Sequence, residues 1–322
     1  MRLTPSVDNP LPAALFGIVL GLSGLGQAWR VSVRLWGLPA TVGESILLGA
    51  TGTWAVLLTR YLWQALRSPQ LLRKEFLHPV QGSTPALLAV STLLVVLAVL
   101  PYSYGLAAVL AVLGVGWHVG FSLWHTGILW QGGREPLDTL PTLYLPSVAG
   151  NFTSAAALSA LGFSDWGWLF LGVGLFSWLA LESLVIQRLW QPQVVPVPQR
   201  PLLGIQPAPP VVCAMAWLIL APQEAASHGM IMLWGYGVYQ LLLGVRLGPW
   251  LGAQGFAPSY WAYTFGLAAA TVCTLKLAAA GVTSAQALAV PIFVGANLFI
   301  GYLTARTLYG FLRRQFGTMG SR

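Results

Sequence analysis

Residues 258–279 read PSYWAYTFGLAAATVCTLKLAA, and this stretch decides the fold class. It begins at Pro258, crowds aromatic side chains into its first turns, and continues to Ala279 with a single charged residue, Lys276. A helix of about 20 apolar residues is what crosses the hydrocarbon core of a bilayer. The stretch is therefore predicted to span a membrane, with Phe265 and then Gly266 near its middle.

The whole chain has the same character. Of its 322 residues 56% are hydrophobic and 7% charged, and the mean hydropathy is +0.71. A soluble domain carries about 25% charged residues, so the composition predicts an integral membrane protein. The net charge of +8 is assigned to cytoplasmic loops, not to nucleic-acid binding. Cys213 and Cys273 lie in apolar runs and offer neither a disulfide framework nor a metal site.

Ten apolar segments are long enough to span, and no β-barrel alternation is found. They form one predicted transmembrane domain, residues 1–322, because the linkers 67–83 and 191–202 are too short to be domains. The ten segments are 11–31, 42–66, 84–102, 104–130, 142–163, 166–190, 203–221, 229–247, 258–279 and 285–311.

The odd-numbered segments each carry proline near their start. Similar spacing between these prolines predicts five helical hairpins repeated in the same orientation, with a pseudo-symmetry axis along the membrane normal. Five such first helices around the axis would enclose a central pore. The alternative is that prolines are simply common at helix starts and in membrane helices. The prolines are Pro12, Pro85, Pro146, Pro207 with Pro209 and Pro210, and Pro258.

Basic residues set the orientation. If both termini are cytoplasmic, only Arg30, Arg34 and Lys276 of the 16 lysines and arginines fall on the outer side. Cytoplasmic loops are enriched in lysine and arginine. The prediction is a multi-pass protein of the bacterial inner membrane with both termini in the cytoplasm.

Few residues offer chemistry. Glu182 is read either as a proton-binding group for coupled transport or as a bundle-facing carboxylate satisfied by a hydroxyl or by Arg188. His118 and His125 share a helix face, but a metal site needs further donors, so packing is favoured and no metal is expected. Ser23, in a short glycine-rich motif like that of rhomboid proteases, lacks a second catalytic partner. No catalytic residue and no enzyme activity are predicted.

The odd-numbered segments are also nearly free of charge. Lys276 is their one charged residue away from the ends. A cation pathway would be expected to present rings of acidic side chains. A carrier that binds a dianion would need arginines within its membrane-spanning segments. The conduit that remains is apolar and must close sterically or by dewetting. Gly17 and Gly21 either bring helices close together or line such a conduit without filling it.

Several blocks in order resemble a known family. LPAALFGIVLG, YLPSVAGNFTSA, FSWLALESLVIQRL, GIQPAPPVV, WGYGVYQLL and SYWAYTFG are similar to the tellurite-resistance and C4-dicarboxylate transporter family, in its bacterial TehA branch, which is related to plant guard-cell slow anion channels. The resemblance covers nearly the whole chain. It implies a homotrimer of ten-helix protomers, each with five hairpins around a quasi-five-fold pore that conducts small inorganic anions without a cofactor.

The resemblance also implies a gate. The matching residue is Phe265, with Phe16 beside it, and Gly266 is expected to leave the ring room to move. On the residues alone, the alternative is that this ring packs against lipid or in the core. The predicted pore-lining residues are Phe16, Gly17, Pro146, Pro210 and Gly266. The predicted function is an anion channel for small monovalent anions, associated with tellurite resistance. The alternative is a proton-coupled carrier of C4-dicarboxylates or oxyanions that would depend on Glu182.

Overall fold

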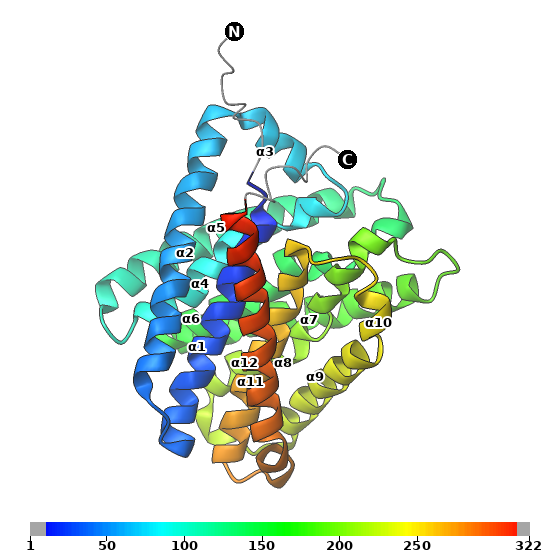
Figure 1. Cartoon of the computed structure of the whole chain (residues 1–322). Helices are drawn as coiled ribbons and strands as arrows, with labels where there is room; N and C mark the ends of the chain where they lie inside the picture. Colours follow the sequence, from blue (N-terminus) through cyan, green and yellow to red (C-terminus); the bar gives the residue numbers. More distant parts are fainter. Residues whose placement is uncertain (1–10, 314–322) are drawn as a thin grey trace.

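The computed structural model describes residues 11–313, and every regular element in that range is helical (Figure 1). Eight helical stretches there are long and apolar enough to cross a membrane, which confirms an all-helical, multi-span membrane protein. They are Ala13–Trp36, Ala40–Arg67, Gln81–Val99, Tyr104–Trp130, Ser164–Leu189, Val197–Leu220, Pro258–Ala279 and Thr283–Leu312.

Two of the ten expected spans are helical but fall outside that set. Segment 142–163 is interrupted: a 3-10 turn (η4, Pro141–Leu143) and a π-helical stretch (η5, Leu145–Ala149) precede α6 (Gly150–Ala160). Segment 229–247 forms α9 (His228–Arg246), which carries polar residues within its 19 residues. Ten spans therefore remain a prediction.

The other helices follow the apolar segments closely. One differs from expectation: residues 67–83, read as a linker, contain the helix α3 (Pro69–Phe76), which begins with proline at a position helices tolerate. The remaining helices are α1 (Gly17–Trp36), α2 (Ala40–Arg67), α4 (Ala86–Val99), α5 (Tyr104–Trp130), α7 (Ser164–Leu189), α8 (Ala208–Leu220), α10 (Gly248–Leu251), α11 (Ala262–Ala279) and α12 (Thr283–Leu312).

Consecutive long helices pack in pairs: α1 with α2, α4 with α5, α6 with α7, α8 with α9, and α11 with α12. We call the first member of each pair an inner helix and the second an outer helix. The inner helices contact one another in chain order, α1–α4–α6–α8–α11, and α11 packs back along α1. Figure 1 shows this last contact, with α11 and α12 lying beside α1 although they come from the opposite end of the sequence.

Burial separates the two sets of helices. In the four inner stretches long enough for the comparison, 61–89% of the most apolar window is buried, whereas the four comparable outer helices have 22–33%. Every residue from Gly150 to Ala157 in α6 is buried as well. The outer helices present large apolar side chains such as Leu48, Leu123 and Phe176 on the molecular surface. That surface is suited to lipid, which solvates apolar side chains.

The inner helices share an unusual start. Each is preceded by a short 3-10 or π turn: η1 (Ala13–Phe16), η2 (Gln81–Ser83), η5, η6 (Val197–Ile205) and η8 (Pro258–Trp261). Pro146 and Pro258 lie within these turns, Pro12, Pro85 and Pro207 lie within two residues of one, and Pro209 and Pro210 lie in the first turn of α8. Proline cannot donate an amide hydrogen bond and is tolerated in the first turn of a helix but not in its interior, so these prolines mark where each inner helix starts.

Candidate functional site

Contacts with neighbouring helices define three faces of α11. Thr264 and Ala268 lie against α1, because a Cβ built on Gly21 or Gly24 would come within 2.6 Å of their Cβ atoms. Cys273 lies against α8, where its Sγ donates to the Val211 carbonyl at 3.2 Å. Thr274 faces the outer helix α9, and its Oγ1 accepts a hydrogen bond of 2.8 Å from Trp234 Nε1.

The fourth face of α11 holds Phe265, Ala269, Val272 and Lys276. These residues are spaced i, i+4, i+7 and i+11, so they share one stripe of a helix with 3.6 residues per turn. Phe265 lies nine residues before Thr274, which puts the two on opposite sides of the helix. Since Thr274 faces an outer helix, the Phe265 stripe faces the interior of the set of inner helices.

The Phe265 ring is buried within this interior. It is 5% exposed and borders a cavity of about 10 Å³, which is at the lower limit for one water molecule. Helix α6 contacts α8, and the other walls come from the η6–α8 segment and from Tyr144 with the η5–α6 segment. They are Tyr144, Leu145, Val148, Ala149, Phe152, Ile205, Ala208, Pro209 and Val212.

Phe16 and Gly17 lie on the α1 side of this interior. Phe16 is fully buried, and its ring meets Tyr61 of the outer helix α2 edge-on at 6.1 Å. A Cβ on Gly17 would lie 3.6 Å from the Trp261 Cβ, an ordinary van der Waals distance, so this residue faces the start of α11. Neither residue borders the Phe265 cavity.

The other three predicted lining residues occupy different positions. Pro146 is buried within the π-helical η5. The Pro210 ring points toward Gly237 of α9, and it is the preceding Pro209 that borders the Phe265 cavity. A Cβ on Gly266 would lie 3.0 Å from the Ala208 amide nitrogen. Gly266 thus lets α11 approach the start of α8 closely, instead of leaving the open space beside the ring that we expected.

Unpartnered polar atoms of α1 also lie toward the interior. Ser23 and Gln27 are one turn apart on a face between the side that packs on α11 and the side where Arg30 reaches the end of α4. Ser23 Oγ and Gln27 Nε2 are buried, and among the described residues neither has a hydrogen-bond partner. Buried polar groups without protein partners are uncommon. These two atoms are therefore available to water or a solute.

Glu182 on α7 is the centre of a separate polar cluster. Its Oε2 accepts hydrogen bonds from Tyr144 Oη (2.7 Å) and Trp178 Nε1 (2.9 Å), and its Oε1 accepts from Gln206 Nε2 (2.9 Å) and Tyr236 Oη (2.7 Å). The carboxylate joins α7 and α9 to the segments that precede α6 and α8. The carboxylate therefore has two hydroxyl partners, Tyr144 and Tyr236, as one of the two sequence interpretations expected.

Arg188 does not contribute to this cluster. Its guanidinium is buried and donates to the backbone carbonyls of Leu137 and Gln193 at 3.0 and 2.9 Å. It therefore connects the loops on either side of α6 and α7, and it leaves the Glu182 carboxylate without an ion pair in the described part of the chain.

The two histidines have packing roles. His118 is 2% exposed and lies against Gly150 of α6 and the ring of Phe170 on α7. His125 contacts Ser83 Oγ at 3.2 Å. Both residues thus connect the outer helix α5 to inner segments, as the favoured sequence interpretation proposed.

A carboxylate of α3 anchors the start of α1. Glu75 Oε1 accepts a hydrogen bond from the Ala13 amide at 2.7 Å, and Oε2 accepts one from Tyr61 Oη at 2.8 Å. The amide belongs to η1, whose first donors have no helical partner. Burial raises the pKa of the Glu75 carboxyl above its usual value, and the two hydrogen bonds oppose that rise.

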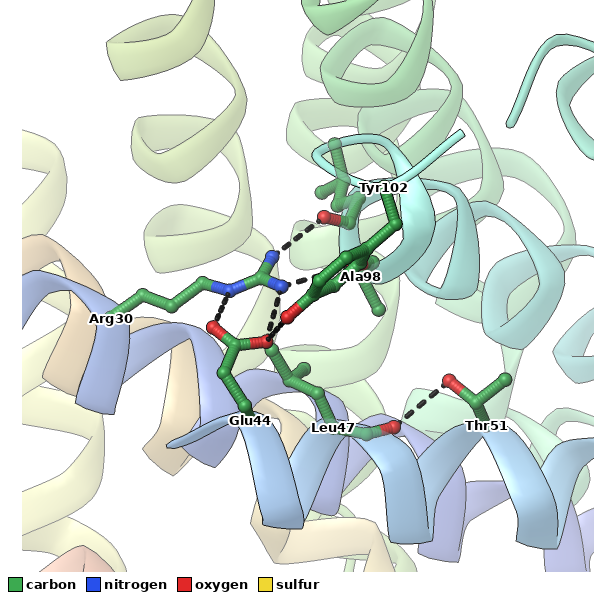
Figure 2. A network of polar contacts seen from close by, with 7 residues as sticks. Arg30, Glu44, Leu47, Thr51, Ala98 and Tyr102 are labelled. Atoms are coloured by element: carbon green, nitrogen blue, oxygen red, sulfur yellow. Dashed lines mark hydrogen bonds and ion pairs between the residues drawn. The ribbon is translucent and has the colours of Figure 1, made fainter. Parts of the chain in front are cut away.

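An ion pair joins three helices at the opposite end of α1 (Figure 2). Arg30 pairs with Glu44 of α2 through two hydrogen bonds of 2.7 and 2.8 Å, and it donates to the last carbonyls of α4, Leu97 and Ala98, at 3.0 Å each. Tyr102 Oη donates to the same carboxylate at 2.7 Å. Within residues 11–313 this is the one salt bridge, so the charge of Arg30 is compensated.

These features describe a helical membrane protein in which Phe265 is buried among the inner helices and the described residues of α4, α6 and α8 include no charged side chain. The family model described as voltage-dependent anion channel matches residues 10–308. The chain belongs to this family. It is a multi-pass membrane anion channel and not an enzyme.

Individual relatives agree with this assignment. The chain is 34% identical over 308 residues to the tellurite resistance protein TehA homolog of Haemophilus influenzae, covering 95% of this chain and 93% of the relative. It is 25% identical to the S-type anion channel SLAH3 and 24% identical to the guard cell S-type anion channel SLAC1, both of Arabidopsis thaliana. Those matches cover 83% and 84% of this chain but 43% and 50% of the plant proteins.

Proposed function

We propose that the chain forms a passive channel for small monovalent anions, with a pore along the axis of the five inner helices and a gate formed by Phe265. The observation that carries this proposal is the position of Phe265 on the interior stripe of α11, beside a cavity no larger than a water molecule. Five hairpins packed as a closed series, with proline-containing turns at each inner helix start, support a quasi-five-fold arrangement.

In such a pore, selectivity arises from the width of the pore and from the weak electrostatic field along it. In the described residues, the inner helices α4, α6 and α8 contain no charged side chain. An apolar constriction can close by excluding water, and it conducts once the obstructing group moves. Weak binding along the path favours rapid passage over tight capture. The likeness to a tellurite resistance protein suggests an association with that phenotype, which we propose for this chain too.

The proposal includes a membrane setting. The distribution of basic residues favours cytoplasmic termini in a bacterial inner membrane, with the N-terminal ends of the inner helices facing the cytoplasm. A homotrimer is proposed on the family resemblance, with lipid and neighbouring protomers covering the apolar outer helices. Crosslinking of the protein in native membranes, followed by mass determination, tests the trimer.

The alternative function is a proton-coupled carrier that uses Glu182. The four hydrogen bonds to its carboxylate favour a structural role, because they tie it to residues from three other segments of the chain. A carrier would need this group to change partners during each cycle. A channel needs it only to keep the helices in place.

Glu182→Gln separates the two functions. We expect the variant to keep anion flux that does not saturate with substrate and does not require a proton gradient. We also expect a lower melting temperature, because an amide cannot accept all four hydrogen bonds and each lost buried bond costs about 1–3 kcal/mol. Flux is measured in proteoliposomes loaded with chloride, nitrate or a C4-dicarboxylate, with Ser183→Ala on the exposed side of α7 as control. Proton-driven, saturable dicarboxylate uptake that disappears only in Glu182→Gln would favour the carrier.

A further inference from the structure

Lys276 lies on the stripe of α11 that carries the candidate gate. It is eleven residues beyond Phe265, so it occupies the same face about 16 Å farther along the helix. Its side chain is half-buried. Its ammonium group has no ion-pair partner within residues 11–313, although a charge inside a membrane protein is normally paired.

Two side chains of α1 face the same region. Helices α1 and α11 run side by side, with Gly17, Gly21 and Gly24 against Trp261, Thr264 and Ala268. This register aligns Lys276 with residue 32. Gln27 then lies about 8 Å closer to the gate and Arg34 about 3 Å farther out. Gln27 and Arg34 are seven residues apart and therefore share one face of α1.

The charges in this region are not compensated. Arg34 is the charged side chain whose field acts on Lys276, and it too lacks an ion pair among the described residues. The nearby carboxylate of Glu44 is already occupied by Arg30 and Tyr102 (Figure 2). Gln27 adds a buried amide donor, Nε2, for which the described part of the chain offers no acceptor. Two cationic side chains and an unpaired N–H donor can bind an anion through charge-assisted hydrogen bonds.

We propose that Lys276, Arg34 and Gln27 form an anion-binding site in the outer half of the pore, between the Phe265 gate and the outer mouth. The ligand is a small inorganic monovalent anion such as chloride or nitrate. The inference rests on the proposed function for its place in a pore. The site concentrates anions outside the constriction, since like charges that line a cleft raise the local concentration of counter-ions. Its separation from the gate lets the anion leave it when the ring moves.

Lys276→Gln in a Phe265→Ala background tests the site. At low external chloride, we expect the unitary current carried by chloride entering from the outer side to fall by roughly three-fold or more relative to Phe265→Ala alone. In 1 M salt the two should converge, because the Debye length is then only about 3 Å. Lys276→Arg should retain the current. Lys74→Gln removes the same charge from the exposed α3 and should change nothing on the outer side.

A binding measurement keeps this inference separate from the channel function. Chloride titrated into purified protein at constant ionic strength, balanced with gluconate, should raise the melting temperature of the wild type and of Lys276→Arg, because a ligand that binds the folded state stabilises it. The rise should be lost in Lys276→Gln. Equal chloride dependence of melting and of outer-side current in Lys276→Gln and its parent would overturn the site. If Phe265→Ala carries no current while the melting shift depends on Lys276, the gate fails and the site stands.

Discussion

Phe265→Ala is expected to raise the anion conductance of the channel by about ten-fold or more. A ten-fold rise requires only ~1.4 kcal/mol off the barrier to permeation, and the ring borders the small cavity between α11, the η6–α8 segment and the η5–α6 segment. Removing it opens a continuous space where the cavity now holds at most one water molecule. The measurement is whole-cell current in oocytes at matched surface expression, with chloride and nitrate as the charge carriers.

Phe170→Ala is the matched control. Phe170 is also a buried phenylalanine, at 8% exposure, but it lies on the outer helix α7 against His118. Both substitutions create a cavity, and Phe→Ala changes in a core typically cost about 3–5 kcal/mol. Only the loss of Phe265 should increase current. Similar currents from the two variants would mean that loosened packing, and not a gate, explains the effect.

Gly21→Ala and Gly24→Ala are expected to lower stability strongly. Their added Cβ atoms would come within 2.6 Å of the Cβ atoms of Thr264 and Ala268 on α11. Neither contact is with the end of a flexible side chain, so the two helices must separate. Overpacking of this kind costs about 1–3 kcal/mol per site. Thermal unfolding of the purified protein in detergent, followed by size-exclusion chromatography, measures the loss.

Two glycines of α2 provide the comparison. Gly49 and Gly52 have no atom within 4 Å of an added Cβ. Alanine favours a helix over glycine by about 1 kcal/mol, so Gly49→Ala and Gly52→Ala should leave the melting temperature unchanged or raise it. If the variants of α1 melted like those of α2, the close approach of α1 and α11 would not contribute to stability.

The fold class follows from hydropathy, but the arrangement of the helices does not. Transmembrane helices can be predicted from apolar segments of sufficient length. Proline positions indicated where each inner helix begins. The contact that brings α11 back to α1 joins segments more than 200 residues apart, and only tertiary packing determines it. The short helix α3 was missed because a charged, amphipathic segment of eight residues resembles a linker.

The candidate site was predictable in part. The family resemblance pointed to Phe265. Lys276 was not predicted as a site residue, although its spacing of eleven residues from Phe265, which puts both on one helix face, can be read from the sequence. The hydrogen-bond partners of Glu182 could not be predicted from the sequence, because Tyr144, Gln206 and Tyr236 come from distant segments. Adjacent prolines also could not be told apart: Pro209 borders the cavity, while Pro210 faces α9.

Single-channel recording from purified protein in planar bilayers tests the central claim most directly. Under a chloride gradient, Phe265→Ala should show discrete unitary currents that reverse near the chloride equilibrium potential, while the wild type should open rarely. Such currents exceed what a carrier can turn over. A correctly folded Phe265→Ala protein that shows no unitary current, or one that reverses at the cation equilibrium potential, would contradict an anion pore gated by this ring.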